Sequence, residues 1–208
     1  GGRAVDEFDK PTWQQVGRLL ARIHIEGAKN TGSNRIHWRP AVATRQHLEI
    51  LKKSNTVPYD FTPAVFGAIE TLIKGNNALF DAADYLLIHG DCHRGNFIYR
   101  PNEGIYLIDF DDMAVGSVVQ DLWMLLPGSP KECPNEMEWF LEGYETFRDF
   151  PMGSLDLVPV LRAMRMVHFS AWCALQEKEP EFAENFPNWG DSRYWNELLS
   201  DLQQLIKP

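Results

Sequence analysis

Hydrophobic residues recur at every third or fourth position near the start of the chain, beginning at Trp13 and continuing through Val16 and Leu20. This spacing places apolar side chains on one face of an α-helix. Gly27 follows the pattern, and glycine is common just beyond the end of a helix. The pattern predicts a helix over residues 11–26.

Helical spacing also dominates the rest of the chain outside its central region. Prolines lie between these segments or at their starts, as expected where helices begin or end. The spacing predicts helices at residues 42–54, 62–80, 118–126, 134–148, 155–178 and 192–206. Four tryptophans on these segments are interpreted as core residues: Trp123, Trp139, Trp172 and Trp195.

Short apolar and aromatic runs replace the helical spacing in the middle of the chain. They cover Tyr85–His89, Phe97–Tyr99 and Ile105–Ile108, and Gly, Pro and Asn separate them. Such runs are typical of short β-strands. Residues 100–104 carry the turn residues of a hairpin. Since no internal repeat or linker is evident, the sequence predicts one α+β, mainly helical unit over residues 1–208.

Composition and charge restrict the function. Of the 208 residues, 44% are hydrophobic and 24% are charged, which is typical of a globular chain that buries a core without disulfides. Asp and Glu outnumber Lys and Arg by 29 to 20, which gives a formal net charge of -9. An acidic protein of this kind is poorly suited to nucleic-acid phosphates or anionic membranes, so we expect neither as a partner.

The cysteines and the apolar runs bear on the location of the protein. Cys92, Cys133 and Cys173 have no paired spacing, which is typical of a reducing compartment. The longest apolar run, Met166–Leu175, is far shorter than the ~20 residues that cross a bilayer. We therefore expect a cytoplasmic protein without a membrane span.

Polar residues gather directly after two of the predicted strands. The segment His89–Asn96 follows the first strand, and Asp109 follows the third. A hairpin of the second and third strands would bring Asp91, Asn96 and Asp109 to one end of the β element. Three oxygen-bearing side chains at one place suit a hard cation such as Mg²⁺. For any single aspartate, capping of a turn is the alternative explanation.

Two other kinds of site are conceivable in the same segment. His89, Cys92 and His93 are residue types that bind zinc, but no second pair with ligand spacing lies nearby. Cys92 and His93 could also form a nucleophile pair, but neighbouring side chains on a loop point apart. We therefore favour the magnesium interpretation over both alternatives.

The order of these residues resembles that of a known superfamily. His89-Gly90-Asp91, with Asn96 five positions after the aspartate, is similar to the H-x-D-x-x-x-x-N catalytic loop of protein-kinase-like enzymes. Ile108-Asp109-Phe110-Asp111 stands where those enzymes have D-F-G. Together the two segments resemble the aminoglycoside phosphotransferase and choline kinase family. The resemblance implies the large, C-terminal lobe of a kinase fold, whose short strands carry the catalytic and metal loops.

The resemblance also implies roles for individual residues. Asp91 would orient the acceptor hydroxyl and receive its proton, while Asn96 and Asp109 would hold Mg²⁺ on the phosphates of ATP. Asp121 would hydrogen-bond the backbone of the catalytic loop, with a favourable charge at a helix N-terminus as the alternative. The carboxylates at 111–112 are interpreted as solvated turn residues, with a second metal or the acceptor as the alternative for the first of them.

Two further stretches bear on the acceptor. Val119–Leu126 and Leu161–Arg165 resemble a bacterial stress-response Ser/Thr kinase of the same family. This resemblance implies an ATP-dependent kinase for Ser or Thr of proteins. The alternatives are a kinase for a small alcohol of the choline, homoserine or aminoglycoside type, and a non-catalytic binding module. Arg162 and Arg165 share one helix face, which either reaches the acceptor or phosphates or is simply solvated.

Parts of the kinase pattern are missing from the sequence. The chain has no V-A-I-K-type lysine and no Gly-rich phosphate cover, both of which belong to the small lobe. We therefore expect the 208 residues to form the large lobe of a longer enzyme, with the small N-lobe absent from this chain. No A-P-E string follows Asp121, so we expect no phosphorylated activation segment.

Overall fold

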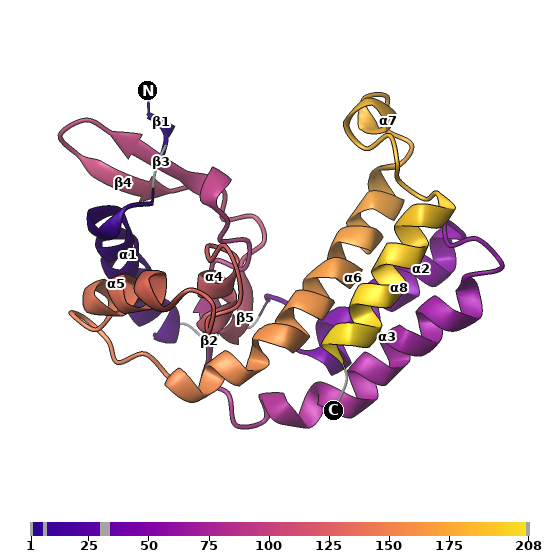
Figure 1. The fold of residues 1–208 in the computed structure, drawn as a ribbon, viewed down its shortest axis with the longest axis horizontal. Coiled ribbons are helices and arrows are strands. Elements are labelled where there is room, and N and C mark those ends of the chain that lie inside the picture. The colour runs from indigo at the N-terminus through magenta and orange to yellow at the C-terminus, as the bar shows by residue number, and fades with distance from the viewer. Residues whose placement is uncertain (1, 6–7, 30–33, 207–208) are drawn as a thin grey trace. The chain divides into compact units, whose positions relative to one another are not determined.

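The computed structural model describes residues 2–5, 8–29 and 34–206, and Figure 1 labels their helices and strands. The chain divides into two compact units. The first unit contains the residues up to His37 together with Ala83–Val158. The second unit contains Trp38–Ala82 together with the residues from Pro159 onward. That all 208 residues form one kinase-like lobe stays a prediction.

Helix α1 (Lys10–Ala28) confirms the helix expected over residues 11–26. Asp9 caps the N-terminus of α1, and its side chain accepts a hydrogen bond from the Thr12 backbone N–H at 3.0 Å. This bond satisfies one of the N–H groups that the first turn leaves unpaired. The apolar face of α1 is buried in the core of the first unit, including Trp13, Val16 and Leu20.

Helix α1 packs against α5 (Pro134–Tyr144), and the two lie side by side in Figure 1. Gly143 permits this approach, because a Cβ at that position would lie 2.1 Å from the Gln14 carbonyl oxygen. Helix α4 (Val119–Trp123) is the third helix of this region. Both α4 and α5 are shorter than the predicted 118–126 and 134–148, because hydrogen-bonded turns replace their last residues.

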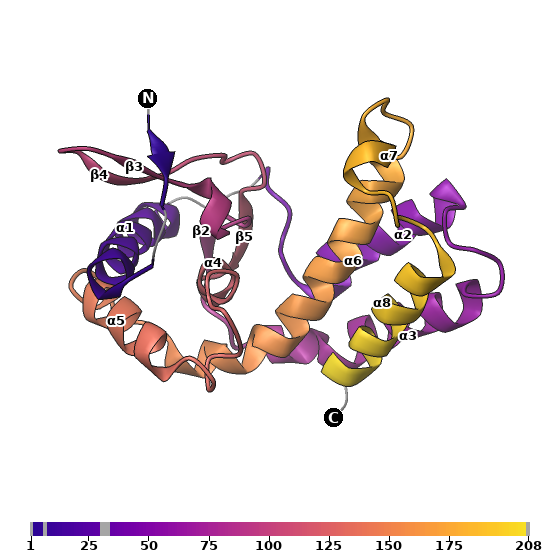
Figure 2. The ribbon, with the colours of Figure 1, turned by 45° about the horizontal axis from the view of Figure 1, so that its top comes forward.

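Two small antiparallel sheets complete the first unit. In one sheet β3 (Phe97–Arg100) lies between β1 (Arg3–Ala4) and β4 (Gly104–Leu107), as Figure 2 shows. The other sheet pairs β2 (Tyr85–Ile88) with β5 (Ala114–Ser117). The three predicted strands and the hairpin are confirmed. The pattern missed β1 and β5, since one is only two residues long and the other combines Ala, Val, Gly and Ser.

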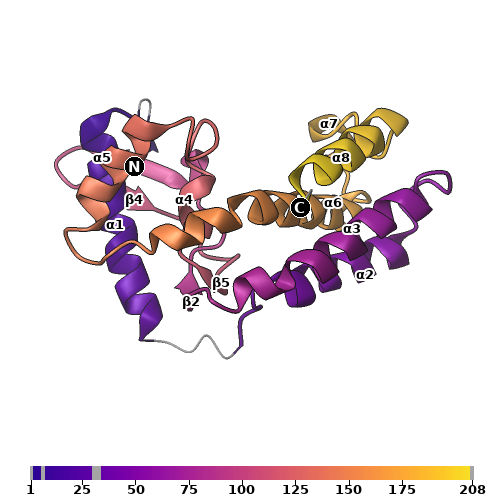
Figure 3. The same cartoon turned by 60° about the horizontal axis from the view of Figure 1, so that its bottom comes forward.

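The second unit is helical (Figure 3). Its helices are α2 (Arg45–Ser54), α3 (Thr62–Asn76), α7 (Phe182–Asn185) and α8 (Ser192–Leu205), together with α6 (Val158–Gln176) from its second residue onward. A π-helical turn at Pro40–Thr44 precedes α2, so the segment predicted as one helix over 42–54 changes its hydrogen-bond pattern. Within residues 8–29 and 34–206, no helix combines the length and apolar character needed to cross a membrane.

The tryptophans predicted as core residues differ in burial. Trp195 is completely buried, which confirms its interpretation. Trp123 and Trp139 are half-buried. Trp172 is 40% exposed, so its assignment to the core was wrong. Its indole lies 5.6 Å from the ring of Phe186, where it forms part of an aromatic cluster at the surface.

Candidate active site

The loop that carries the predicted catalytic residues leaves β2 at His89 and turns into β3 at Phe97. Gly90 stands at its start with φ +87°, in the left-handed region that glycine adopts without strain. A Cβ at Gly90 would lie 2.3 Å from the backbone oxygen of Asp112. Glycine therefore allows this loop to lie directly against the segment that follows β4.

The structure brings together the segments that carry the three predicted site residues. The Asn96 side-chain Nδ2 donates a hydrogen bond to the backbone carbonyl of Asp91 at 2.9 Å. The backbone N–H of Ile108 donates to the Asn96 carbonyl at 3.0 Å, directly before Asp109. The pairing of Phe97 with Leu107 fixes this register of the hairpin. The three residues therefore lie at the same end of the β3–β4 hairpin.

Asp109 has an unusual backbone conformation. Its φ is +65°, which places a non-glycine residue in the left-handed region, where Asp and Asn are tolerated better than most residues. His89 holds the residue before Asp109 in place, because its buried ring Nε2 bonds to the Ile108 carbonyl at 2.9 Å. Backbone strain of this kind persists where surrounding contacts impose it, and it concentrates at functional sites. The Asp109 side chain is exposed.

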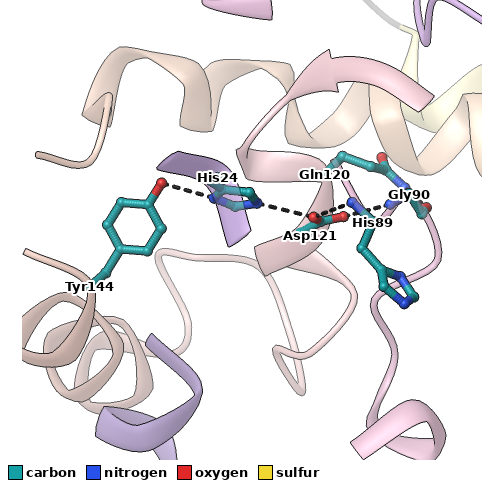
Figure 4. Close-up of polar contacts among 6 residues, drawn as sticks. All are labelled: His24, His89, Gly90, Gln120, Asp121 and Tyr144. Carbon is teal, nitrogen blue, oxygen red and sulfur yellow. Dashed lines mark hydrogen bonds and ion pairs between the residues drawn. The ribbon is translucent and has the colours of Figure 1, made fainter. Parts of the chain in front are cut away.

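Asp121 anchors the start of the catalytic loop (Figure 4). Its carboxylate is completely buried in α4. One carboxylate oxygen accepts the backbone N–H of His89 and the other accepts that of Gly90, both at 2.8 Å. The adjacent Gln120 donates its side-chain N–H to the Gly90 carbonyl at 3.1 Å. The hydrogen bonds expected from the resemblance are confirmed, although Asp121 also lies in the first turn of its helix.

A buried histidine completes the support of Asp121. The ring Nε2 of His24 lies 3.0 Å from the Asp121 carboxylate, and its Nδ1 lies 2.9 Å from the Tyr144 hydroxyl. Burial raises the pKa of Tyr144 well above its ordinary value, so the hydroxyl keeps its proton. The Asp121 carboxylate can only accept, so Nε2–H of His24 donates to it, and in the uncharged ring Nδ1 then accepts from the Tyr144 hydroxyl.

Sequence reasoning missed His24 and Tyr144. A signal for His24 was present, since it follows Val16 and Leu20 at intervals of four on the apolar face of the predicted helix. A polar side chain on such a face needs a buried partner. Its partners lie far away in the chain, so the spacing alone could not identify them.

We expect Asp121→Asn to lower the free energy of unfolding by about 1–3 kcal/mol, because one buried N–H would face an amide NH₂ instead of an oxygen. Urea unfolding would measure the loss. Asp156→Asn, which changes an exposed carboxylate of the same unit, is the matched control and should stay within about 0.5 kcal/mol of the wild type. Equal stability of the two variants would contradict the anchoring role.

The alternative sites considered for the loop do not fit its geometry. Cys92 is completely buried, and burial raises the pKa of its thiol well above the ordinary value, so it is not a thiolate. His89 and His93 instead bond to the Ile108 carbonyl and to the Gly95 backbone N–H. Within the described part of the chain, no three His, Cys, Asp or Glu side chains form a group that could hold a metal ion.

The donors at the hairpin end fit a hard cation that also binds phosphate. Because Asn96 gives its amide N–H to the Asp91 carbonyl, its Oδ1 is the atom left to bind a metal. Asp109 adds an exposed carboxylate on the neighbouring segment. Amide and carboxylate oxygens suit Mg²⁺, which is usually held by one or two such groups together with phosphate oxygens and water.

The remaining residues singled out in the sequence have weaker structural support. The carboxylates at 111–112 are exposed, as expected for turn residues, and Arg35 donates to the backbone carbonyl of Asp111 at 2.9 Å. Arg162 and Arg165 belong to α6 in the second unit. Arg162 is exposed and Arg165 is half-buried. Their proposed reach toward acceptor or phosphates stays a prediction.

Comparison with known proteins gives a consistent result. Residues 5–157 match the family model described as the phosphotransferase enzyme family. The chain is 34% identical over 200 residues to stress response kinase A of Escherichia coli K12, and 32% identical over 201 residues to the serine/threonine protein kinase RdoA of Salmonella typhimurium. Each alignment covers 94% of this chain but 59% of the relative, so the chain spans about three fifths of their length.

Solved kinase structures share the fold. The amicoumacin kinase hAmiN, in complex with AMP-PNP, Ca²⁺ and Ami, superposes with a TM-score of 0.68 at 18% identity, covering 99% of this chain and 62% of that one. The choline kinase LicA of Streptococcus pneumoniae gives a TM-score of 0.59 at 20% identity, with 94% and 64% covered. The kinase-like, mainly helical fold expected from the sequence is confirmed.

Proposed function

Because the chain belongs to the phosphotransferase enzyme family, we propose that it serves to transfer the γ-phosphoryl group of ATP to an alcohol. In this proposal Asp91 is the base, and Asn96 and Asp109 hold Mg²⁺ on the nucleotide. The main support is the hydrogen bond from Asn96 to the Asp91 carbonyl, which couples the metal ligand to the base. The bond joins the Asn96 side chain to the backbone of Asp91, so the two residues lie next to each other at the end of the hairpin.

The proposed reaction needs few groups from the protein. The acceptor oxygen bonds to the γ-phosphorus, the bond from this phosphorus to the β,γ-bridging oxygen breaks, and ADP leaves. The hydroxyl proton passes to the Asp91 carboxylate, whose side chain is 17% exposed and so open to an acceptor. Bound Mg²⁺ would neutralise charge on the phosphates.

We propose Ser and Thr of proteins as the acceptors. The relatives that align over 94% of this chain are named as a stress response kinase and a serine/threonine protein kinase, which supports this choice. The structural neighbours named as amicoumacin and choline kinases support a small-molecule alcohol as the second candidate. A role in stress response follows from the same relatives and is part of the proposal.

We also propose that the chain is the large lobe of the enzyme and acts in the cytoplasm. The relatives extend well beyond the matched region, which is consistent with a small lobe elsewhere in the full-length protein. Cys92, Cys133 and Cys173 are free thiols, as is usual in a reducing compartment. A non-catalytic module is disfavoured, because it has no chemical need for all three site residues.

The acceptor can be identified with radiolabelled ATP. We expect the purified full-length protein to label Ser or Thr of a protein, itself included, and to leave choline and aminoglycosides unlabelled. The Asp91→Asn variant is the control for contaminating kinases. Label on a small alcohol alone would replace the first candidate with the second, and no label on any alcohol would contradict the proposed function.

A further inference from the structure

A second histidine of the catalytic loop lies beside Asp91. The ring Nε2 of His93 is 3.6 Å from the Asp91 carboxylate oxygen Oδ2. This distance is about half an ångström longer than a hydrogen bond, and such contacts in substrate-free enzymes often shorten in the working complex. The His93 side chain is 44% exposed, so its ring can make this small movement.

The other ring nitrogen of His93 determines where its proton lies. Nδ1 accepts a hydrogen bond from the Gly95 backbone N–H at 3.0 Å. A backbone N–H can only donate, so Nδ1 cannot carry a proton in this arrangement. In the uncharged ring the proton is then on Nε2, which is the nitrogen that faces Asp91.

Gly95 makes this arrangement possible. A Cβ at Gly95 would lie 2.9 Å from Cε1 and 3.0 Å from Nδ1 of the His93 ring. Any larger residue at this position would push the ring away from the turn, and with it the Nε2–H that points at Asp91. The loop sequence therefore provides both the imidazole and the space that it occupies.

We propose that His93 is a positioning residue for Asp91, an inference that rests on the proposed function. Its Nε2–H holds Oδ2 of the carboxylate, while Gly95 fixes the ring through Nδ1. The other carboxylate oxygen, Oδ1, is then directed to the acceptor hydroxyl and takes its proton. His93 itself neither gains nor loses a proton in the step.

Two substitutions separate this role from a merely structural one. In His93→Asn the amide reaches the place of Nδ1, so it can still accept from Gly95 but cannot reach Asp91. In His93→Gln the longer side chain can place an N–H where Nε2 was, so it can still donate to Asp91. Each variant thus keeps one of the two contacts and serves as the control for the other.

The measurement is steady-state kinetics of the full-length protein. We expect His93→Asn to lower kcat about tenfold with little change in the KM for ATP, and His93→Gln to restore most of the loss. Wild-type kcat in His93→Asn, or equal losses in both variants with a raised KM for ATP, would overturn the proposal. Gly95→Ala should resemble His93→Asn, because the new methyl group displaces the ring.

A second readout does not depend on catalysis. Long-range proton–nitrogen NMR correlations on ¹⁵N-histidine-labelled protein identify which ring nitrogen of His93 carries the proton. We expect Nε2, and protonation at Nδ1 would overturn the inference. If the wild type transfers no phosphate while Nε2 is protonated, the proposed function fails but the geometry of His93 stands.

Discussion

Asp91→Asn is expected to lower kcat of the full-length enzyme by about a hundredfold or more, in the range that general-base catalysis contributes. The substitution keeps the size of the side chain and leaves the backbone carbonyl that binds Asn96. It removes the group that can accept the proton of the acceptor hydroxyl. Nucleotide affinity should change much less, because the proposed metal ligands Asn96 and Asp109 remain.

Steady-state kinetics together with a nucleotide titration would test this split between kcat and binding. Glu103→Gln is a matched control, since Glu103 is an exposed carboxylate at the opposite end of the same hairpin. It should leave kcat and nucleotide affinity unchanged. A turnover number for Asp91→Asn within a few fold of the wild type would remove Asp91 as the base.

The parts of the site whose interacting residues lie close together in the sequence could be predicted, and the parts whose residues lie far apart could not. The turn that places Asn96 beside Asp91 is closed within five residues, and the hairpin that brings Asp109 near them is short. Both features can be read from local sequence. The contacts of His24 join residues 97 and 120 positions apart, and no local pattern contains that information.

The same difference between local and distant interactions explains which elements of the fold could be predicted. The helices were predictable because long amphipathic segments carry many positions that agree on one period. Strand β5 was missed because Gly116 and Ser117 give no strand signal, and it forms only by pairing with β2. Trp172 was misplaced because a helix with apolar residues on several faces does not reveal which face is covered. Residues that are distant in the sequence and pack against the helix decide which face is covered.

The second large effect concerns Asp109, where the backbone conformation guides the choice of substitution. Alanine would remove the carboxylate but would also strain a position with φ +65°, at a cost of about 1–2 kcal/mol. Asparagine tolerates the left-handed region and nearly matches aspartate in size. Asp109→Asn therefore removes the negative charge while the segment after Ile108 keeps its conformation.

We expect Asp109→Asn to weaken binding of Mg²⁺–ATP about tenfold to a hundredfold in the full-length protein, since one charge-assisted contact is worth about 1.5–3 kcal/mol. Calorimetric titrations of ATP with and without Mg²⁺ would measure the effect: Mg²⁺ should increase the affinity for ATP less in Asp109→Asn than in the wild type. Thermal melts should be equal for Asp109→Asn and wild type but lower for Asp109→Ala. An unchanged Mg²⁺ dependence would exclude Asp109 as a ligand, because the carboxylate charge is the property that the cation binds.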